Sequence, residues 1–118
     1  MSQALLNLIK KSRELKVTVN KHTFISRRPT DVEALQLHRS EAEFHEIARD
    51  FVTGWDNVTE NDIVGGGGSD AVAFDKELWN EWCNDRPDFW RPIASAVLDA
   101  YTLHSKRLQD AEKNSQAG

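Results

Sequence analysis

The densest apolar pattern lies between residues 73 and 101, which hold three of the four tryptophans and the only cysteine. Asp75 is a suitable N-cap, because its side-chain oxygen can accept a free backbone N–H at the start of a helix. Leu78 and Trp82 then fall on one helical face. The helix is expected to end before Pro87, since the residue preceding a proline is steered away from helical dihedrals.

A longer helix is predicted after this break. Apolar residues recur there at three- and four-residue spacing, at Trp90, Ile93, Ala94, Val97, Leu98, Tyr101, His104 and Leu108. Deep inside a helix, Pro92 would lose a hydrogen bond and clash with the preceding turn. Regular helix is therefore expected to begin only just before Pro92.

The N-terminal segment predicts a short helix and a hairpin. Leu5, Leu8 and Ile9 lie on one face of a helix within residues 1–15, which form a candidate arm. β-branched residues on both sides of a polar pair then favour an antiparallel β-hairpin near residues 16–27.

Two further helices are expected in the middle of the chain. Thr30 or Asp31 caps the first, whose apolar contacts come from Val32, Leu35 and Leu37. Ser40 and Glu43 resemble a capping box for the second, which would end at Gly54. Its apolar face consists of Phe44, Ile47, Ala48 and Phe51.

These elements predict a mainly α fold, a small helical domain with a short antiparallel β-hairpin near the N-terminus. Residues 1–118 form a single domain with an N-terminal helical arm (1–15), a core (16–111) and a flexible tail (112–118), since the chain is long enough for one core only. The predicted core comprises Phe44, Ile47, Phe51, Trp55, Phe74, Leu78, Trp82, Trp90, Ile93, Val97 and Tyr101.

Gly65 to Gly68 predict a loop, because four consecutive glycines lose much backbone entropy on ordering. A phosphate-binding loop would need a following Gly-Lys-Ser/Thr, but Ser-Asp-Ala-Val follows here. Phosphate binding is therefore not expected.

Composition indicates a soluble globular protein, with 39% hydrophobic and 29% charged residues. No apolar run approaches the roughly 20 residues needed to cross a bilayer. The N-terminus is not expected to be a signal peptide, because its basic residues follow the short apolar patch. A single cysteine fits a reducing compartment, and the cytoplasm is the expected location.

Charge is distributed unevenly along the chain. Residues 1–28 carry seven basic side chains and only Glu14 as an acid, a net charge of +6, whereas the remainder carries 8 basic and 18 acidic side chains, a net charge of -10. Such a split can steer an acidic partner, a nucleic acid or a sister subunit, or the basic end can simply lie solvated beside an acidic body. Nucleic-acid binding is not expected, since the recognised motifs are missing and the chain is acidic.

Candidate chemistry is sparse. His38, His45 and Glu41 could share a metal only if one helix ran through Ser40, where a break is expected. Cys83 has no obvious base beside it and is expected to be a buried structural thiol. No constellation predicts catalysis, a cofactor or a metal site.

The apolar arm, the basic segment and some of the tryptophans are better explained by contacts with a partner protein than by catalysis. Tryptophans are most simply core residues, although one or two of them could belong to a partner surface, where aromatic residues are enriched. The arm and the basic segment supply apolar and charged contacts. The candidate partner-binding residues are Leu5, Leu8, Ile9, Arg27, Arg28, Trp55 and Trp79.

Several segments together resemble a known family. They are residues 51–58 (FVTGWDNV), an acidic and glycine-rich loop, residues 72–78 (VAFDKEL), residues 85–93 (DRPDFWRPI) and the pair Ala100-Tyr101. With residues 24–33 (FISRRPTDVE), this order of spaced aromatic and turn residues is similar to that of the tail assembly chaperones of long-tailed bacteriophages. The four-glycine loop and the N-terminal helix depart from the family pattern.

The resemblance implies a non-enzymatic protein in the cytoplasm of an infected or lysogenic bacterium. It would bind the tape measure protein, keep it soluble and promote tail-tube assembly, with the tail-tube protein as a further partner, and would be absent from the mature virion. Self-association into a homo-oligomer is also expected. Two alternatives remain open, a tail-completion or head–tail connector protein and a small nucleic-acid-binding regulator.

Overall fold

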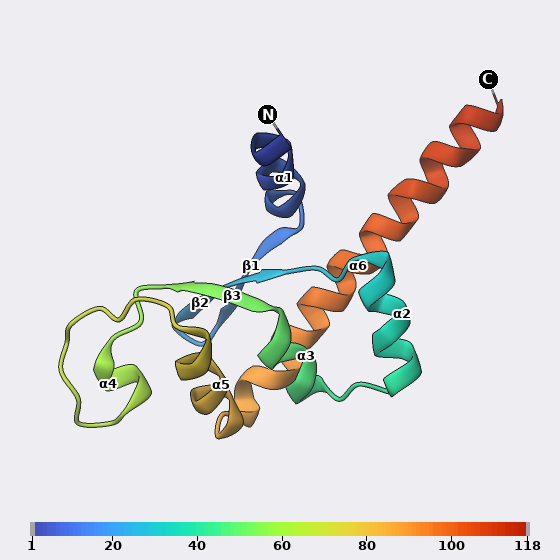
Figure 1. Ribbon diagram of the computed structural model, residues 1–118. Helices are drawn as coiled ribbons and strands as arrows, with labels where there is room; N and C mark the ends of the chain where they lie inside the picture. Colours follow the sequence, from blue (N-terminus) through green and yellow to red (C-terminus); the bar gives the residue numbers. More distant parts are fainter. Residues whose placement is uncertain (1, 118) are drawn as a thin grey trace.

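The computed structural model describes residues 2–117, with side chains as far as Asn114. In chain order the elements are α1 (Ser2–Lys11), β1 (Glu14–Val19), β2 (His22–Arg27), α2 (Asp31–Ser40), α3 (Phe44–Phe51), β3 (Val52–Asp56), α4 (Glu60–Ile63), α5 (Lys76–Asn84) and α6 (Pro87–Ala117). Figure 1 shows the helices around one small sheet. The mainly helical character is confirmed, but the fold is mixed α/β.

The predicted hairpin is present and belongs to a larger sheet. β1 and β2 pair antiparallel around Asn20, whose φ of 57° is left-handed and suits asparagine. β3 pairs antiparallel with β2, which gives the order β1-β2-β3. The sequence predicted only two of these three strands.

β3 occupies residues where a helix was expected to continue to Gly54. That prediction was wrong, because α3 ends at Phe51 and the β-branched pair Val52-Thr53 begins a strand. Gly54 suits the strand for steric reasons: a Cβ there would come within 3.3 Å of the Ile25 side chain on β2. Close packing between strands, not the end of a helix, therefore explains this glycine.

Caps define the helices on either side of residue 41. Thr30 caps α2 as predicted, accepting from the Glu33 amide while the Glu33 carboxylate accepts from the Thr30 amide. The prediction that Ser40 caps the next helix is wrong. Ser40 is the last residue of α2, and Glu41 follows it as the C-cap in a left-handed conformation with φ of 51°. α3 begins later, where the Glu43 amide donates to the Glu46 carboxylate at 3.2 Å.

The core lies where α3, α5 and α6 pack against one face of the sheet (Figure 1). Its centre is aromatic, because the ring of Phe24 on β2 lies 4.9 Å from that of Trp79 and 5.0 Å from that of Phe89. All three side chains are fully buried. None of them was named among the predicted core residues, although the tryptophans as a group were expected to lie mainly in the core.

Most other core predictions are confirmed. The buried members are Ile47, Phe51, Trp55, Trp82, Ile93 and Val97, and the partly buried members packed against them are Phe74, Leu78 and Trp90. Tyr101 is half-buried but lies outside this cluster. Phe44 was wrongly included, since it is 44% exposed at the first residue of α3. Val32 and Leu35 are also exposed, because α2 has no buried residue and only Leu37 packs against the core.

α6 begins at Pro87, earlier than predicted. A proline at the first helical position loses nothing, because that N–H has no partner within the helix. Pro92 therefore lies inside α6, where it is exposed to solvent. The expected tail, residues 112–118, is helical as far as Ala117, and Gly118 lies outside the described residues. Across residues 2–117, every helix is too short or too polar to cross a bilayer.

Hydrogen bonds order the glycine-rich loop. The Gly67 amide donates to Val64 O at 2.9 Å, and the Asn61 amide donates to Gly68 O at 3.0 Å. The Asn61 side chain accepts from the amide of Gly66, whose φ of +91° requires glycine. The loop thus folds back over α4.

Candidate functional site

α1 is an amphipathic helix that contributes no buried residue to the fold. Leu5 and Leu8 are each 64% exposed, and Ile9 is 50% exposed. Lys10 and Lys11 in its last turn complement the helix dipole, but an isolated helix of this length is marginal in water. Burying one such leucine or isoleucine side chain contributes about 1.5–3 kcal/mol of stabilising free energy. The fold does not gain this contribution, because the side chains of α1 stay exposed.

The far part of α6 also lacks a covering layer. We call residues 103–114 distal α6. Leu103 and Leu108 are 48% and 53% exposed on this segment. Figure 1 shows α1 and distal α6 projecting from the body toward the same end of the view. Both helices thus present exposed leucines to solvent.

A hollow of about 420 Å³ lies at the base of these two helices. We call it the basal hollow. One wall comes from the turn after α1 and the ends of β1 and β2, and the other comes from α6. The lining residues are Ser12, Arg13, Glu14, Arg28, Ala100, Leu103, His104 and Arg107.

Arg28 is held in place at the basal hollow. Its backbone amide donates to Arg13 O at 2.9 Å, and its guanidinium donates to Pro29 O at 2.9 Å. Partial burial and then the neighbouring charge of Arg13 lower the pKa of Arg28 from its ordinary value. The guanidinium stays charged, and its surroundings favour an incoming negative group.

A polar cluster fixes the direction of α6 beside the hollow. Tyr101 donates its hydroxyl to Asp31 Oδ1 at 2.7 Å, and His104 Nε2 lies 3.5 Å from Asp31 Oδ2. The hydrogen bonds from Tyr101 and then His104 hold the pKa of Asp31 below its ordinary value. These contacts tie α6 to the start of α2.

The predicted partner-binding residues separate into two groups. Leu5, Leu8 and Ile9 lie exposed on α1, and Arg28 lies at the basal hollow. Arg27 already pairs with Glu33 at 2.7 and 2.8 Å and lies over the Phe51 ring at 4.5 Å. Trp79 is 0% exposed and Trp55 is 8% exposed, so this fold places both in the core, away from a partner surface.

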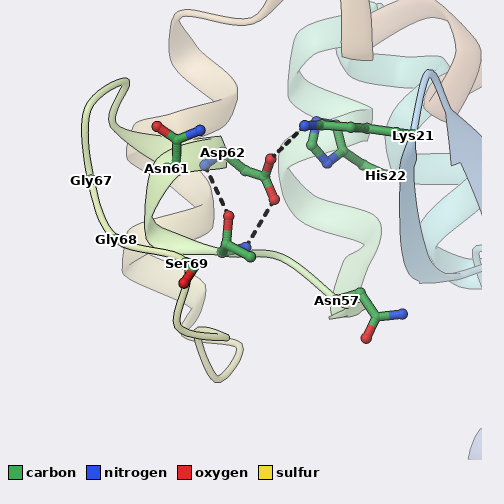
Figure 2. Close-up of a pocket in the computed structure, with 9 residues that line it drawn as sticks. Lys21, His22, Asn57, Asn61, Asp62, Gly67, Gly68 and Ser69 are labelled. Carbon is green, nitrogen blue, oxygen red and sulfur yellow. Dashed lines mark hydrogen bonds and ion pairs between the residues drawn. The ribbon is translucent and has the colours of Figure 1, made fainter.

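A second hollow, of about 490 Å³, lies beside the glycine-rich loop (Figure 2). There Asp62 accepts from the Thr59 amide at 2.9 Å and pairs with Lys21 Nζ at 3.0 Å. The Thr59 amide and then Lys21 lower the pKa of Asp62 to about 2. His22 is buried at the back, which lowers its pKa and favours the neutral imidazole. The charges here already satisfy each other, and their contacts hold the loop.

Cys83 is a buried thiol, as the sequence predicted. Burial raises its pKa to about 11, so the reactive thiolate is scarce near neutral pH. Among the residues that the structure describes, no three His, Cys, Asp or Glu side chains gather as a metal site. His38 and His45 belong to separate helices, α2 and α3.

Sequence reasoning missed Arg13, Leu103 and Arg107. Leu103 lies off the apolar stripe of α6, and a leucine on an otherwise polar helical face is the signal that could have indicated it. Arg13 and Arg107 are far apart in sequence, and the pairing of β1 with β2 brings the first toward α6. Their meeting depends on tertiary structure.

Comparisons with known proteins found no similarity. The chain matches no family model, no curated protein and no solved structure. Its function must therefore be inferred from its own surface, on which α1 and distal α6 flank the basal hollow. We call these three parts together the α1–α6 surface.

Proposed function

We propose that this protein is a non-enzymatic assembly chaperone that covers an amphipathic helix of a client protein. The one observation that carries the proposal is α1, a helix with an apolar face and no buried residue. Distal α6 carries further exposed leucines, Leu103 and Leu108. Surfaces of this kind typically mark sites of protein–protein contact.

Helix-in-groove packing is the binding mode that fits this surface. An amphipathic helix places apolar anchors at three- and four-residue spacing into a complementary apolar surface. α1 offers such anchors in Leu5, Leu8 and Ile9, and distal α6 adds two separate exposed leucines, Leu103 and Leu108. A client helix lying along them would bury its own apolar face, which would otherwise drive aggregation.

The client class follows from the resemblance to phage tail assembly chaperones. We propose that the client is the tape measure protein, a long helical chain whose apolar seams need cover before assembly. The complex would form in the cytoplasm of the bacterial host and promote polymerisation of the tail-tube protein. The chaperone would then leave, so that the mature virion would lack it.

Co-expression with the tape measure protein of the same phage or prophage tests this proposal. We expect the client to move from the insoluble to the soluble fraction and to co-purify with the chaperone. A Leu5→Ser, Leu8→Ser, Ile9→Ser variant should lose this effect, because it removes the apolar face of α1.

A matched control removes exposed apolar residues elsewhere. Val32 and Leu35 on α2 are 65% and 59% exposed, so a Val32→Ser, Leu35→Ser variant changes surface hydrophobicity away from α1. This variant should keep the client soluble. An insoluble client with the unmodified protein, or equal loss in both variants, would contradict the proposal. Abundant protein in purified virions would favour a connector instead.

A further inference from the structure

We propose that the client helix is acidic: a partner helix with carboxylates along the edge of its apolar stripe lies on the α1–α6 surface and places them over the basal hollow. This inference rests on the proposed function and specifies its partner. It commits to a helical protein segment as the occupant. Charge complementarity is the ground for that choice.

Three arginines without a carboxylate partner gather at the basal hollow, whereas the other arginines that form no ion pair within the described residues, Arg39 and Arg91, lie apart from it. Among the side chains that the structure describes, Arg27, Arg49 and Arg86 each contact a carboxylate at 2.7–2.9 Å. Arg13, Arg28 and Arg107 make no such ion pair within the described part of the chain, although all three line one hollow. An arginine fork is well matched to a carboxylate, which it binds with two parallel hydrogen bonds.

The local charge balance is positive although the whole chain is acidic. Glu14 is the only acidic residue that lines the basal hollow, against three arginines. Lys10 and Lys11 at the end of α1 add positive charge next to it. Burial and then the charge of Arg13 lower the pKa of Arg28, while Asp31 acts in the opposite direction. A carboxylate arriving here would offset the repulsion between Arg13 and Arg28.

Apolar side chains beside the arginines favour a helix over a nucleic acid. Leu103 lines the hollow itself, and Leu8 and Ile9 lie exposed on the adjoining helix. A phosphate backbone would leave these side chains in water, whereas an amphipathic helix covers them and presents acids at its flanks. The net charge of -4 also opposes general attraction of nucleic acid.

Fluorescence anisotropy with designed helical peptides tests the inference on the full chain. The probes share one leucine stripe and carry glutamate, glutamine or lysine along its edges. At low salt, the glutamate peptide should bind about tenfold more tightly than the glutamine peptide, which corresponds to about 1.4 kcal/mol. This difference should shrink as added salt screens the charges.

A charge swap at Arg107 separates recognition from folding. Arg107 is exposed, so Arg107→Glu leaves the core intact. We expect this variant to bind the glutamate peptide about tenfold more weakly and the lysine peptide more tightly than the unmodified protein does. Arg91→Glu changes an exposed arginine earlier on α6 and should leave both affinities unchanged.

Three outcomes would overturn the inference. Equal binding of the glutamate and glutamine peptides would remove the acidic preference while leaving the proposed function standing. Binding of none of the peptides, together with an insoluble client in co-expression, would remove both. Tighter binding of a DNA or RNA oligonucleotide than of the glutamate peptide would assign the arginines to phosphate instead.

Discussion

Trp79 is fully buried, and its indole N–H donates to the carbonyls of Ala48 and Arg49 at 3.3 and 3.2 Å. Trp79→Ala would leave a large cavity beside Phe24 and would remove a hydrogen bond from the Ala48 carbonyl, while the Arg49 carbonyl keeps Lys76 Nζ as a donor. We expect a loss of about 3–5 kcal/mol in the free energy of unfolding. Urea unfolding followed by circular dichroism measures this loss.

Trp90 provides the comparison for that measurement. It is only partly buried, although its indole N–H donates to Cys83 O at 2.7 Å. Trp90→Ala should therefore cost less than Trp79→Ala. A loss below about 1 kcal/mol for Trp79→Ala would place this side chain at the surface and contradict the described core.

Glu33 makes stability depend on acid pH. The ion pair with Arg27, followed by the Thr30 amide, lowers the pKa of Glu33 from 4.5 to about 2. The folded state therefore stabilises the ionised form, and this contribution is present above pH 4.5 and is lost as the pH falls toward about 2. We expect Glu33→Gln to lower stability at neutral pH and to flatten its acid dependence.

The control for Glu33 is a carboxylate without such partners. Asp99 is exposed and forms no ion pair within the described residues, so Asp99→Asn should keep the full acid dependence. Urea midpoints at neutral pH and at about pH 3 provide the data. An unchanged pH dependence in Glu33→Gln would show that the ion pair with Arg27 does not operate in solution.

Individual residues were predictable where a local signal decided their role. Thr30 and Asp75 cap helices because their oxygens accept amides three residues on, a relation visible in sequence. Trp79 was left open between core and partner surface, because helical spacing does not reveal how far a neighbouring sheet covers a given position. Phe24 lies on the predicted hairpin, but it is buried by the rings of Trp79 on α5 and Phe89 on α6.

At the scale of elements, the glycine-rich loop offers a matched pair of substitutions. A Cβ at Gly67 would lie 3.0 Å from Glu60 C and Val64 O, whereas a Cβ at Gly65 would meet nothing within 4 Å. Gly67→Ala should therefore destabilise the loop by about 1–3 kcal/mol through overpacking, and Gly65→Ala should be close to neutral.

Amide hydrogen exchange of the loop distinguishes the two variants. The amides of Gly67 and Asn61 donate within the loop and should lose protection in Gly67→Ala. The same amides should stay protected in Gly65→Ala. Equal protection in both variants would mean that the loop is not folded over α4 as described.

Elements were predicted well where an apolar repeat continued over many residues, and poorly where the structure depends on pairing between distant segments. The continuous stripe after Pro87 predicted α6, apart from its start. β3 was missed because five residues after a helix carry too little periodicity, and its strand form depends on pairing with β2. The α1–α6 surface was predicted only in part, since its apolar arm is a local feature and the basal hollow is not.

For the whole molecule, we predict self-association at low salt. Residues 1–28 carry a net charge of +6 and the remainder carries -10, so copies attract one another in the right orientation. The exposed apolar face of α1 adds a contact. Light scattering should show species larger than a monomer, with a smaller mass after removal of residues 1–12 or in high salt. A monomer that responds to neither change would contradict this prediction.

The central claim is that a client helix covers α1 and distal α6. Hydrogen–deuterium exchange with and without the bound tape measure protein tests it most directly, because α1 has no buried residue and its amides should exchange quickly in the free protein. We predict that binding protects residues 2–11 and 103–114 and leaves the exchange of the core unchanged. Unchanged exchange of both segments in a complex that nevertheless forms would contradict the claim.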